Sequence, residues 1–218
     1  MVASMIDHTY LKPEGTPSDI QTLTKEARAH QFKSVCIQPH FVALAKAELE
    51  GSSVEVCTVI GFPLGANTLE TKVFEAKNAL ANGADEIDMV APLGAIKAGD
   101  FDRLKSEVKA LKDVTGDKIL KVILETAMWD DETIYKASEA AFSAGADFVK
   151  TSTGFGSGGA TTEAVKIMKS VPNAKAVKAS GGVRNAADAQ AMIEAGATRI
   201  GTSNGVAIVT GALAHNSY

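Results

Sequence analysis

Two lysines stand near the ends of two consecutive apolar segments of the chain. Lys150 lies in residues 147–151 and Lys178 in residues 174–179, and both segments have the short, apolar, β-branched character of buried strands. Burial and a neighbouring cation both disfavour an ammonium group, and a neutral amine is the nucleophile that forms a Schiff base. The pair therefore predicts covalent chemistry with a carbonyl substrate. The alternative is two unrelated lysines that reach water or pair with acids.

Two aspartates could complete such a site. Asp88 lies in residues 86–90, where strand alternation places Glu86 on the same face, and Asp7 lies in residues 4–8. A buried carboxylate needs a cationic partner, and either lysine would serve. Beside the lysines, Asp88 is expected to relay protons, whereas alone it would be a structural ion pair. Asp7 is a further candidate of the same kind.

Short apolar segments alternate with helical patterns along the whole chain. The expected strands are residues 4–8, 34–38, 54–60, 86–90, 119–125, 147–151, 174–179 and 198–202. The expected helices are residues 17–30, 41–49, 69–81, 100–114, 130–144, 161–170, 186–195 and 203–213. This alternation predicts an α/β fold with a parallel sheet, and eight units fit a (β/α)8 TIM barrel that spans residues 1–218 as a single domain. An open doubly wound sheet is the alternative, because the number of strands alone does not prove closure.

A weak internal repeat supports the eight-unit pattern. Residues 82–85 (NGAD), 144–147 (AGAD) and 195–198 (AGAT) each end a predicted helix with glycine and begin a predicted strand. Glycine just past a helix end adopts the left-handed conformation at little cost, so the same device recurs at equivalent corners.

Two later loops have the composition of a phosphate site. In a TIM barrel the loops after strands seven and eight commonly bind phosphate through backbone N–H groups. Here these loops contain Gly181 and Gly182, followed by Gly201, Ser203 and Asn204. Glycines allow close approach of the backbone, and the serine and asparagine add side-chain donors, so we expect phosphate binding there. Ordinary turn chemistry would explain either loop alone.

A glycine-rich loop follows the first of the two lysines. Thr151, Thr153 and Gly154 begin this loop, and we assign them to the substrate-binding rim near the phosphate. Residues 154–159 (GFGSGG) match the dinucleotide-binding pattern G-x-G-x-x-G, which also requires an acidic residue about 20 positions later. The corresponding place holds a lysine, an alanine and a serine, so a dinucleotide site is rejected.

The overall composition limits the kinds of molecule that the protein is expected to bind. The 218 residues are 45% hydrophobic and 22% charged with a net charge of −4, which gives no basic surface for nucleic acid or an anionic membrane. No apolar segment approaches a membrane span or an export signal, so we expect a cytoplasmic protein. The four histidines show no metal-ligand spacing, and Cys36 and Cys57 fit small buried side chains, so neither metal nor another cofactor is expected.

Taken together, these segments resemble class I deoxyribose-phosphate aldolases over essentially the whole chain. The matching segments, in order, are residues 35–37 (VCI), 61–65 (GFPLG), 85–90 (DEIDMV), 148–154 (FVKTSTG), 177–184 (VKASGGVR) and 199–203 (RIGTS). The resemblance implies a TIM barrel without a metal. It also implies reversible cleavage of 2-deoxy-D-ribose 5-phosphate to acetaldehyde and D-glyceraldehyde 3-phosphate, so both are expected small-molecule partners.

The resemblance also implies roles for single residues. Lys150 would form the Schiff base, Lys178 would be the second lysine that tunes it, and Asp88 would be the acid/base carboxylate. Asp7 matches a further active-site aspartate. The phosphate-binding positions match Gly181, Gly182, Gly201 and Ser203.

The chain departs from the family pattern at one of these positions. The family often has a second serine where this chain has Asn204, so the phosphate contact there is open. Some members end in a tyrosine that reaches the site, and Tyr218 is a candidate for that role, with a frayed terminus as the default. A homodimer is expected from the resemblance. The competing functions are a metal-dependent aldolase, a phosphosugar isomerase, and a non-catalytic barrel that binds phosphorylated metabolites.

Overall fold

Eight parallel strands alternate with helices in residues 2–212, the part of the chain that the computed structural model describes. The strands are β1 (Ile6–Tyr10), β2 (Ser34–Ile37), β3 (Glu55–Ile60), β4 (Glu86–Val90), β5 (Ile119–Ile123), β6 (Phe148–Lys150), β7 (Ala176–Ser180) and β8 (Arg199–Thr202). Each strand pairs in parallel with the next one, and β1 also pairs with β8. The sheet is therefore closed into the predicted TIM barrel, and the open doubly wound sheet is ruled out.

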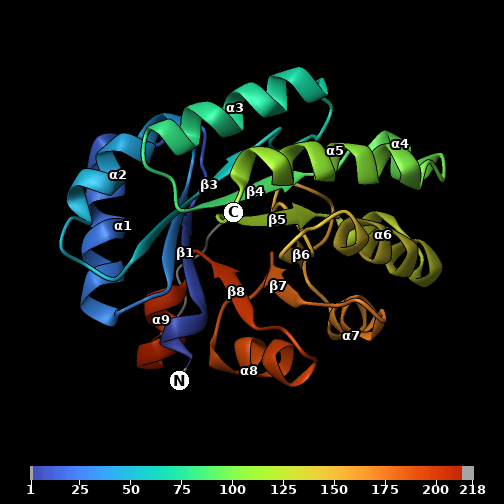
Figure 1. Ribbon diagram of the computed structural model, residues 1–218. Helices are drawn as coiled ribbons and strands as arrows, with labels where there is room; N and C mark the ends of the chain where they lie inside the picture. The colour runs from blue at the N-terminus through green and yellow to red at the C-terminus, as the bar shows by residue number, and fades with distance from the viewer. Residues whose placement is uncertain (1, 213–218) are drawn as a thin grey trace.

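Nine α-helices lie among the described residues, and they surround the strands on the outside (Figure 1). They are α1 (Pro17–His30), α2 (Val42–Glu48), α3 (Leu69–Ala81), α4 (Leu93–Lys97), α5 (Phe101–Thr115), α6 (Asp131–Ser143), α7 (Thr162–Ser170), α8 (Ala186–Glu194) and α9 (Gly205–Thr210). Three single-turn 3-10 helices add η1 (Ala3–Met5), η2 (Pro39–Phe41) and η3 (Thr126–Met128). Side-chain oxygens cap the first turns of six α-helices, from Thr16, Thr68, Asp100, Asp130, Thr161 and Asn185.

The repeated glycines occupy the corners for which they were predicted. Gly83, Gly145 and Gly196 follow α3, α6 and α8, and their φ angles are 103°, 105° and 114°. Side chains rarely tolerate such positive φ values, so glycine is the residue that allows each helix to turn back into the next strand.

The first strand lies two residues later than expected. Residues 4–8 were predicted, whereas β1 spans Ile6–Tyr10 and the preceding residues Ala3–Met5 form a 3-10 turn. The shift brings Thr9 and Leu11 to the C-terminal mouth of the barrel. The sequence pattern missed α4, because five residues after Pro92 are too few to show a helical period.

At most of the other strand and helix ends, the observed boundary differs from the predicted one by a few residues. Tyr218 lies outside the described residues, so its proposed role stays a prediction, as does the single-domain extent over residues 1–218. In residues 2–212, no helix combines the length and the apolar composition that crossing a membrane requires.

Candidate active site

The two predicted lysines lie side by side inside the barrel. Lys150 and Lys178 are register partners in the β6–β7 pair, so their backbones stand at the same height. Both Nζ atoms donate to Oδ2 of Asp88 on β4, at 2.9 Å for Lys150 and 2.8 Å for Lys178. All three side chains are at most 3% exposed. The structure therefore brings the predicted nucleophile, second lysine and carboxylate into direct contact.

A third buried lysine, Lys121 on β5, holds the other oxygen of Asp88. Its Nζ lies 2.7 Å from Asp88 Oδ1 and 2.5 Å from Glu86 Oε2. Burial alone would raise the pKa of Asp88, but the ammoniums of Lys121, Lys150 and Lys178 outweigh burial and hold that pKa well below its usual range. Asp88 is therefore ionised at neutral pH.

Asp7 joins the same cluster from β1. Its Oδ2 lies 2.5 Å from Nζ of Lys178, and its Oδ1 accepts from Arg199 at 2.7 Å and from Ser34 at 2.8 Å. Burial disfavours the charged form of Asp7, yet Lys178, Lys121 and Arg199 together lower its pKa. Burial likewise opposes the ammonium of Lys178, but Asp7 and Asp88 raise its pKa above the ordinary value. Lys178 is therefore a permanent cation beside Lys150.

Arg199 and Glu86 lie at the end of the cluster that is nearest the N-terminal ends of the strands. The guanidinium of Arg199 lies 3.0 Å from Glu86 Oε2, and its Cζ lies 5.2 Å from the centroid of the Phe148 ring. Lys121 and Arg199 were not selected from the sequence, although the same criterion applied to both. Each is a basic residue within a short apolar strand, as Lys150 is.

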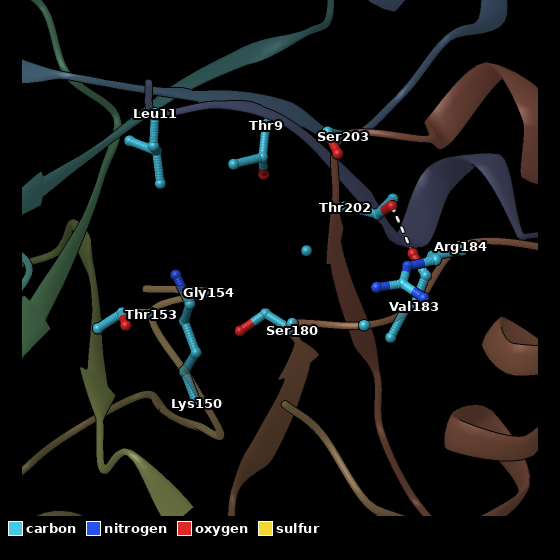
Figure 2. A pocket seen from close by; sticks show the side chains of 13 residues that line it. Thr9, Leu11, Lys150, Thr153, Gly154, Ser180, Val183, Arg184, Thr202 and Ser203 are labelled. Atoms are coloured by element: carbon cyan, nitrogen blue, oxygen red, sulfur yellow. Dashed lines mark hydrogen bonds between the residues drawn. The ribbon is translucent and has the colours of Figure 1, made fainter. Parts of the chain in front are cut away.

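A cavity opens above this cluster at the C-terminal ends of β1, β6, β7 and β8. It is lined by Thr9, Leu11, Lys150, Thr153, Gly154, Ser180, Gly181, Gly182, Val183, Arg184, Gly201, Thr202 and Ser203. Figure 2 shows the Lys150 side chain on one side of the cavity, with Ser203, Thr202 and Arg184 on the other. The lysine and the predicted phosphate loops therefore face one space, and Arg184 adds an exposed cation that the sequence analysis had not selected.

Two of the predicted binding residues lie outside this lining. Thr151 is buried, donates from Oγ1 to the carbonyl oxygen of Ser180 at 2.9 Å, and accepts from its N–H at 3.0 Å. Asn204 is also buried and begins α9, and its N–H donates to Oγ1 of Thr202 at 2.9 Å. Their positions are suited to holding the loops in place, while Thr153, Gly154 and Ser203 reach the cavity itself.

Glycines allow the loops at the mouth to pass very close to one another. A Cβ atom at Gly159 would lie 2.3 Å from the carbonyl oxygen of Gly181, and that oxygen accepts from the N–H of Ala160 at 2.9 Å. A Cβ atom at Gly201 would lie 2.9 Å from Cε of Lys178. The glycine-rich loop after β6 thus passes very close to the loop after β7. This close approach explains why the loop is rich in glycine, and no nucleotide-binding role is needed.

Glu125 organises the start of the loop after β6. Its backbone has φ 54° and ψ 57°, an uncommon conformation for a residue with a side chain, and it is only 4% exposed. Its carboxylate accepts from Oγ1 of Thr153 at 2.6 Å and lies against the backbone at Gly156. This backbone aims the carboxylate at Thr153, so Glu125 holds in place a residue that lines the cavity.

Metal-ligating atoms do gather inside the barrel. The side-chain atoms of Cys36, Cys57 and Asp88 lie within 4.8 Å of one another, as do those of Asp7, Cys57 and Glu86. The Nζ atom of Lys121 lies 2.7 Å from Asp88 and 3.2 Å from Cys57 Sγ, where an ammonium repels a metal cation. The expectation of a metal-free site stays a prediction.

Comparison with known proteins agrees with this geometry. Residues 1–212 match the family described as DeoC/LacD family aldolase. The chain belongs to the DeoC/LacD aldolase family. It is 54% identical over 214 residues to a protein named deoxyribose-phosphate aldolase from Lactococcus lactis subsp. lactis (strain IL1403), covering 98% of this chain and 97% of that one. The protein of the same name from Staphylococcus carnosus (strain TM300) is 54% identical over 217 residues, with 99% of both chains covered.

Two solved structures place the barrel in the same group. A structure named "QR15, an Aldolase" has a TM-score of 0.91 and 43% identity, with 95% of this chain and 93% of that chain covered. A deoxyribose phosphate aldolase from Aeropyrum pernix, described as having a unique tetrameric structure, has a TM-score of 0.87 and 38% identity, with 95% and 89% covered. The predicted family and fold are therefore confirmed for this DeoC/LacD aldolase.

Proposed function

We propose that this DeoC/LacD aldolase reversibly cleaves 2-deoxy-D-ribose 5-phosphate to acetaldehyde and D-glyceraldehyde 3-phosphate through a Schiff base on Lys150. The names of the similar proteins support the substrate. The observation that carries the mechanism is the Lys150 amine, which borders the cavity while Asp88 lies 2.9 Å from its nitrogen. The two glycine-containing loops on the far side support phosphate binding there.

In the direction of synthesis, the neutral amine of Lys150 attacks the carbonyl carbon of acetaldehyde. Uptake of a proton and loss of water give an iminium cation, and the iminium accepts the electrons of the Cα–H bond when the Cα proton leaves. The resulting enamine carbon attacks the aldehyde of glyceraldehyde 3-phosphate. Hydrolysis of the new iminium then frees Lys150. Cleavage follows the same steps in reverse.

Asp88 and Lys178 assist these proton transfers. Because neighbouring lysines hold its pKa low, Asp88 is a weak proton acceptor. We therefore assign it, with Lys178, to orienting a water that takes the Cα proton and passes it to the oxygen that becomes the new hydroxyl. Asp7 holds Lys178 in the charged form from the other side. Gly181, Gly182, Gly201, Ser203 and exposed Arg184 are assigned to the phosphate, with Thr153 and Gly154 on the facing rim.

Reductive trapping tests the assignment directly. Borohydride added with acetaldehyde should leave an ethyl group on Lys150, located by peptide mass mapping. Lys150→Ala should abolish both trapping and turnover, whereas a non-catalytic binding barrel would show binding that survives this change and no turnover by the unaltered protein. Trapping on another residue would refute the role of Lys150. Turnover of deoxyribose 5-phosphate that a chelator abolishes would favour a metal-dependent aldolase.

We also propose that the enzyme works in the cytoplasm as a homo-oligomer. The two buried cysteines, Cys36 and Cys57, are free thiols, which suits a reducing compartment. The Aeropyrum pernix structure is described as tetrameric, whereas the family resemblance favours a dimer. Light scattering of the purified protein distinguishes these assemblies.

A further inference from the structure

The buried charges inside the barrel do not cancel. Four cationic side chains and three carboxylates form one continuous set of ion pairs, and each of the seven side chains is at most 6% exposed. The cations are Lys121, Lys150, Lys178 and Arg199, and the carboxylates are Asp7, Glu86 and Asp88. When all seven are ionised, one positive charge has no matching anion within this set.

Four other titratable groups lie around the set, and within the described part of the chain none of them forms an ion pair with its members. Cys36 on β2 and Cys57 on β3 face Asp88 as thiols. At the inner end, Glu55 lies near Glu86 but pairs with Lys33 at 2.6 Å, so that pair adds no net charge. Beyond β5, Glu125 is hydrogen-bonded to Thr153. A thiolate on Cys36 would cancel the excess, and the neighbouring Cys57 thiol lowers the pKa of Cys36 to about 7.

Of the four cations, Lys150 has the fewest anionic partners. Lys178 lies between two carboxylates, Arg199 contacts two, and Lys121 lies within 3.7 Å of three. Among the residues that the structure describes, Lys150 pairs with Asp88 alone, and it shares the same oxygen with Lys178. A cation with one shared anion in a low-dielectric interior has the least support for its charge.

We propose that Lys121 is a positioning residue whose ammonium supplies the excess positive charge that favours the neutral states of the Lys150 nitrogen. This inference rests on the proposed Schiff-base function. The neutral states are the amine, which attacks the carbonyl, and the enamine, which forms when the iminium loses its Cα proton. The ammonium and the iminium each carry one positive charge, so a positive surrounding disfavours both.

The geometry separates this effect of Lys121 from a contact with substrate. Lys121 is fully buried, does not line the cavity, and holds Oδ1 of Asp88, whereas Lys150 and Lys178 share Oδ2. Its second close partner, Glu86, also lies outside the cavity lining. Changing Lys121 or Glu86 therefore alters the charge of the set without removing a group that touches the substrate.

A set of charge variants tests the proposal. Lys121→Met removes the excess, Glu86→Gln increases it by one, and the double variant restores it. All are made in a Cys36→Ser background, so that ionisation of that thiol does not contribute. Acetylacetone serves as the probe, because an amine adds to one carbonyl and water leaves to give a neutral, absorbing enaminone. The pH at which this adduct forms at half its maximal rate is measured without sugar phosphate, and mass mapping locates it.

The proposal predicts an order of midpoints. Relative to the parent, the midpoint should rise by about one pH unit in Lys121→Met, fall by a similar amount in Glu86→Gln, and return in the double variant. The acid limb of kcat/KM for the sugar phosphate should move in the same order. Lys72→Met, which removes a buried lysine outside the barrel, should leave the midpoint unchanged.

The outcomes are distinguishable. Equal midpoints in all variants, or a lower midpoint in Lys121→Met, would overturn the proposal while leaving the Schiff base intact. Absence of any adduct on Lys150 in the parent would instead overturn the proposed function. Should Lys121→Met fail to fold, a downward shift in Glu86→Gln that the double variant reverses supports the proposal, and no shift refutes it.

Discussion

Lys72 and Lys150 are both buried lysines paired with a carboxylate, yet their surroundings differ. Lys72, on α3, donates to Glu107 at 2.9 Å and to the carbonyl oxygen of Val90 at 3.1 Å, and it lies between the helices and the barrel. Lys150 shares one oxygen of Asp88 with another lysine and borders an open cavity. Lys72 has Oε2 of Glu107 to itself, with the exposed Arg103 on the other oxygen, whereas Lys150 shares Oδ2 of Asp88 with Lys178.

The difference shows that burial of a lysine does not by itself indicate catalysis. A carboxylate oxygen of Glu107 and the carbonyl oxygen of Val90 hold the Lys72 nitrogen in one position. Lys150 competes with two other ammoniums for one carboxylate, which leaves its amine available to a ligand in the cavity. A shortage of anions beside a cavity, rather than burial, separates the reactive lysine from the structural one.

The largest expected effect concerns activity. Lys150→Met should lower kcat/KM for deoxyribose 5-phosphate by about a thousandfold or more, because no other amine borders the cavity in residues 2–212. Lys72→Met should change kcat/KM by only about threefold or less when assayed well below its melting temperature. A comparable loss in both variants would show that the two lysines are not distinct in function.

The next effect concerns stability, for which Lys72 rather than Lys150 is expected to matter more. Lys72→Met should lower the free energy of unfolding by about 3 kcal/mol, because it leaves Oε2 of the buried Glu107 without its lysine, and the exposed Arg103 pairs only with Oε1. Lys72→Met combined with Glu107→Leu should recover most of this loss. Urea denaturation of both variants provides the measurement. No recovery in the double variant would mean that packing of the lysine chain, rather than its charge, stabilises the site.

The phosphate end of the cavity gives a smaller effect. Ser203→Asp should raise KM for deoxyribose 5-phosphate by about tenfold or more through like-charge repulsion, with little change in KM for free 2-deoxyribose. Steady-state kinetics on both sugars separate the two cases. Thr210→Asp, on the exposed end of α9, is the matched control. Equal effects on both sugars would place the phosphate elsewhere.

The smallest expected effect is the change in the free energy of unfolding with pH near neutrality. The pKa values of Asp7, Glu86 and Asp88 are lowered in the folded protein, so their contribution to stability is complete above about pH 5 and is lost as the pH falls below about 4. Between pH 5 and 7 the free energy of unfolding should vary by about 1 kcal/mol or less through these carboxylates.

Urea denaturation across pH tests this dependence. Asp7→Asn should flatten the fall at low pH, since one carboxyl no longer binds its proton more weakly in the folded state. A steep loss between pH 7 and 5 would instead show that groups other than these three carboxylates dominate the pH dependence.

The sequence determined the order of the strand and helix units because local rules repeat along it. Apolar strand segments, helix-capping side chains and corner glycines such as Gly83 act over a few residues, and they set the order of the eight units. The same patterning identified Lys150, Lys178 and Asp88, since a charged residue in a short apolar strand stands out without any structure. Helix α4 and the start of β1 escaped, because short elements show too few periods.

Only the tertiary structure decided how these charges are shared. Closure of the sheet sets every strand's register, and the register decides that Lys121 takes one oxygen of Asp88 while two other lysines share the second. The excess of one positive charge follows from contacts between residues far apart in the chain, so no local pattern reports it. The sequence determined which residues could react, and the closed barrel determined which lysine lacks a matching anion.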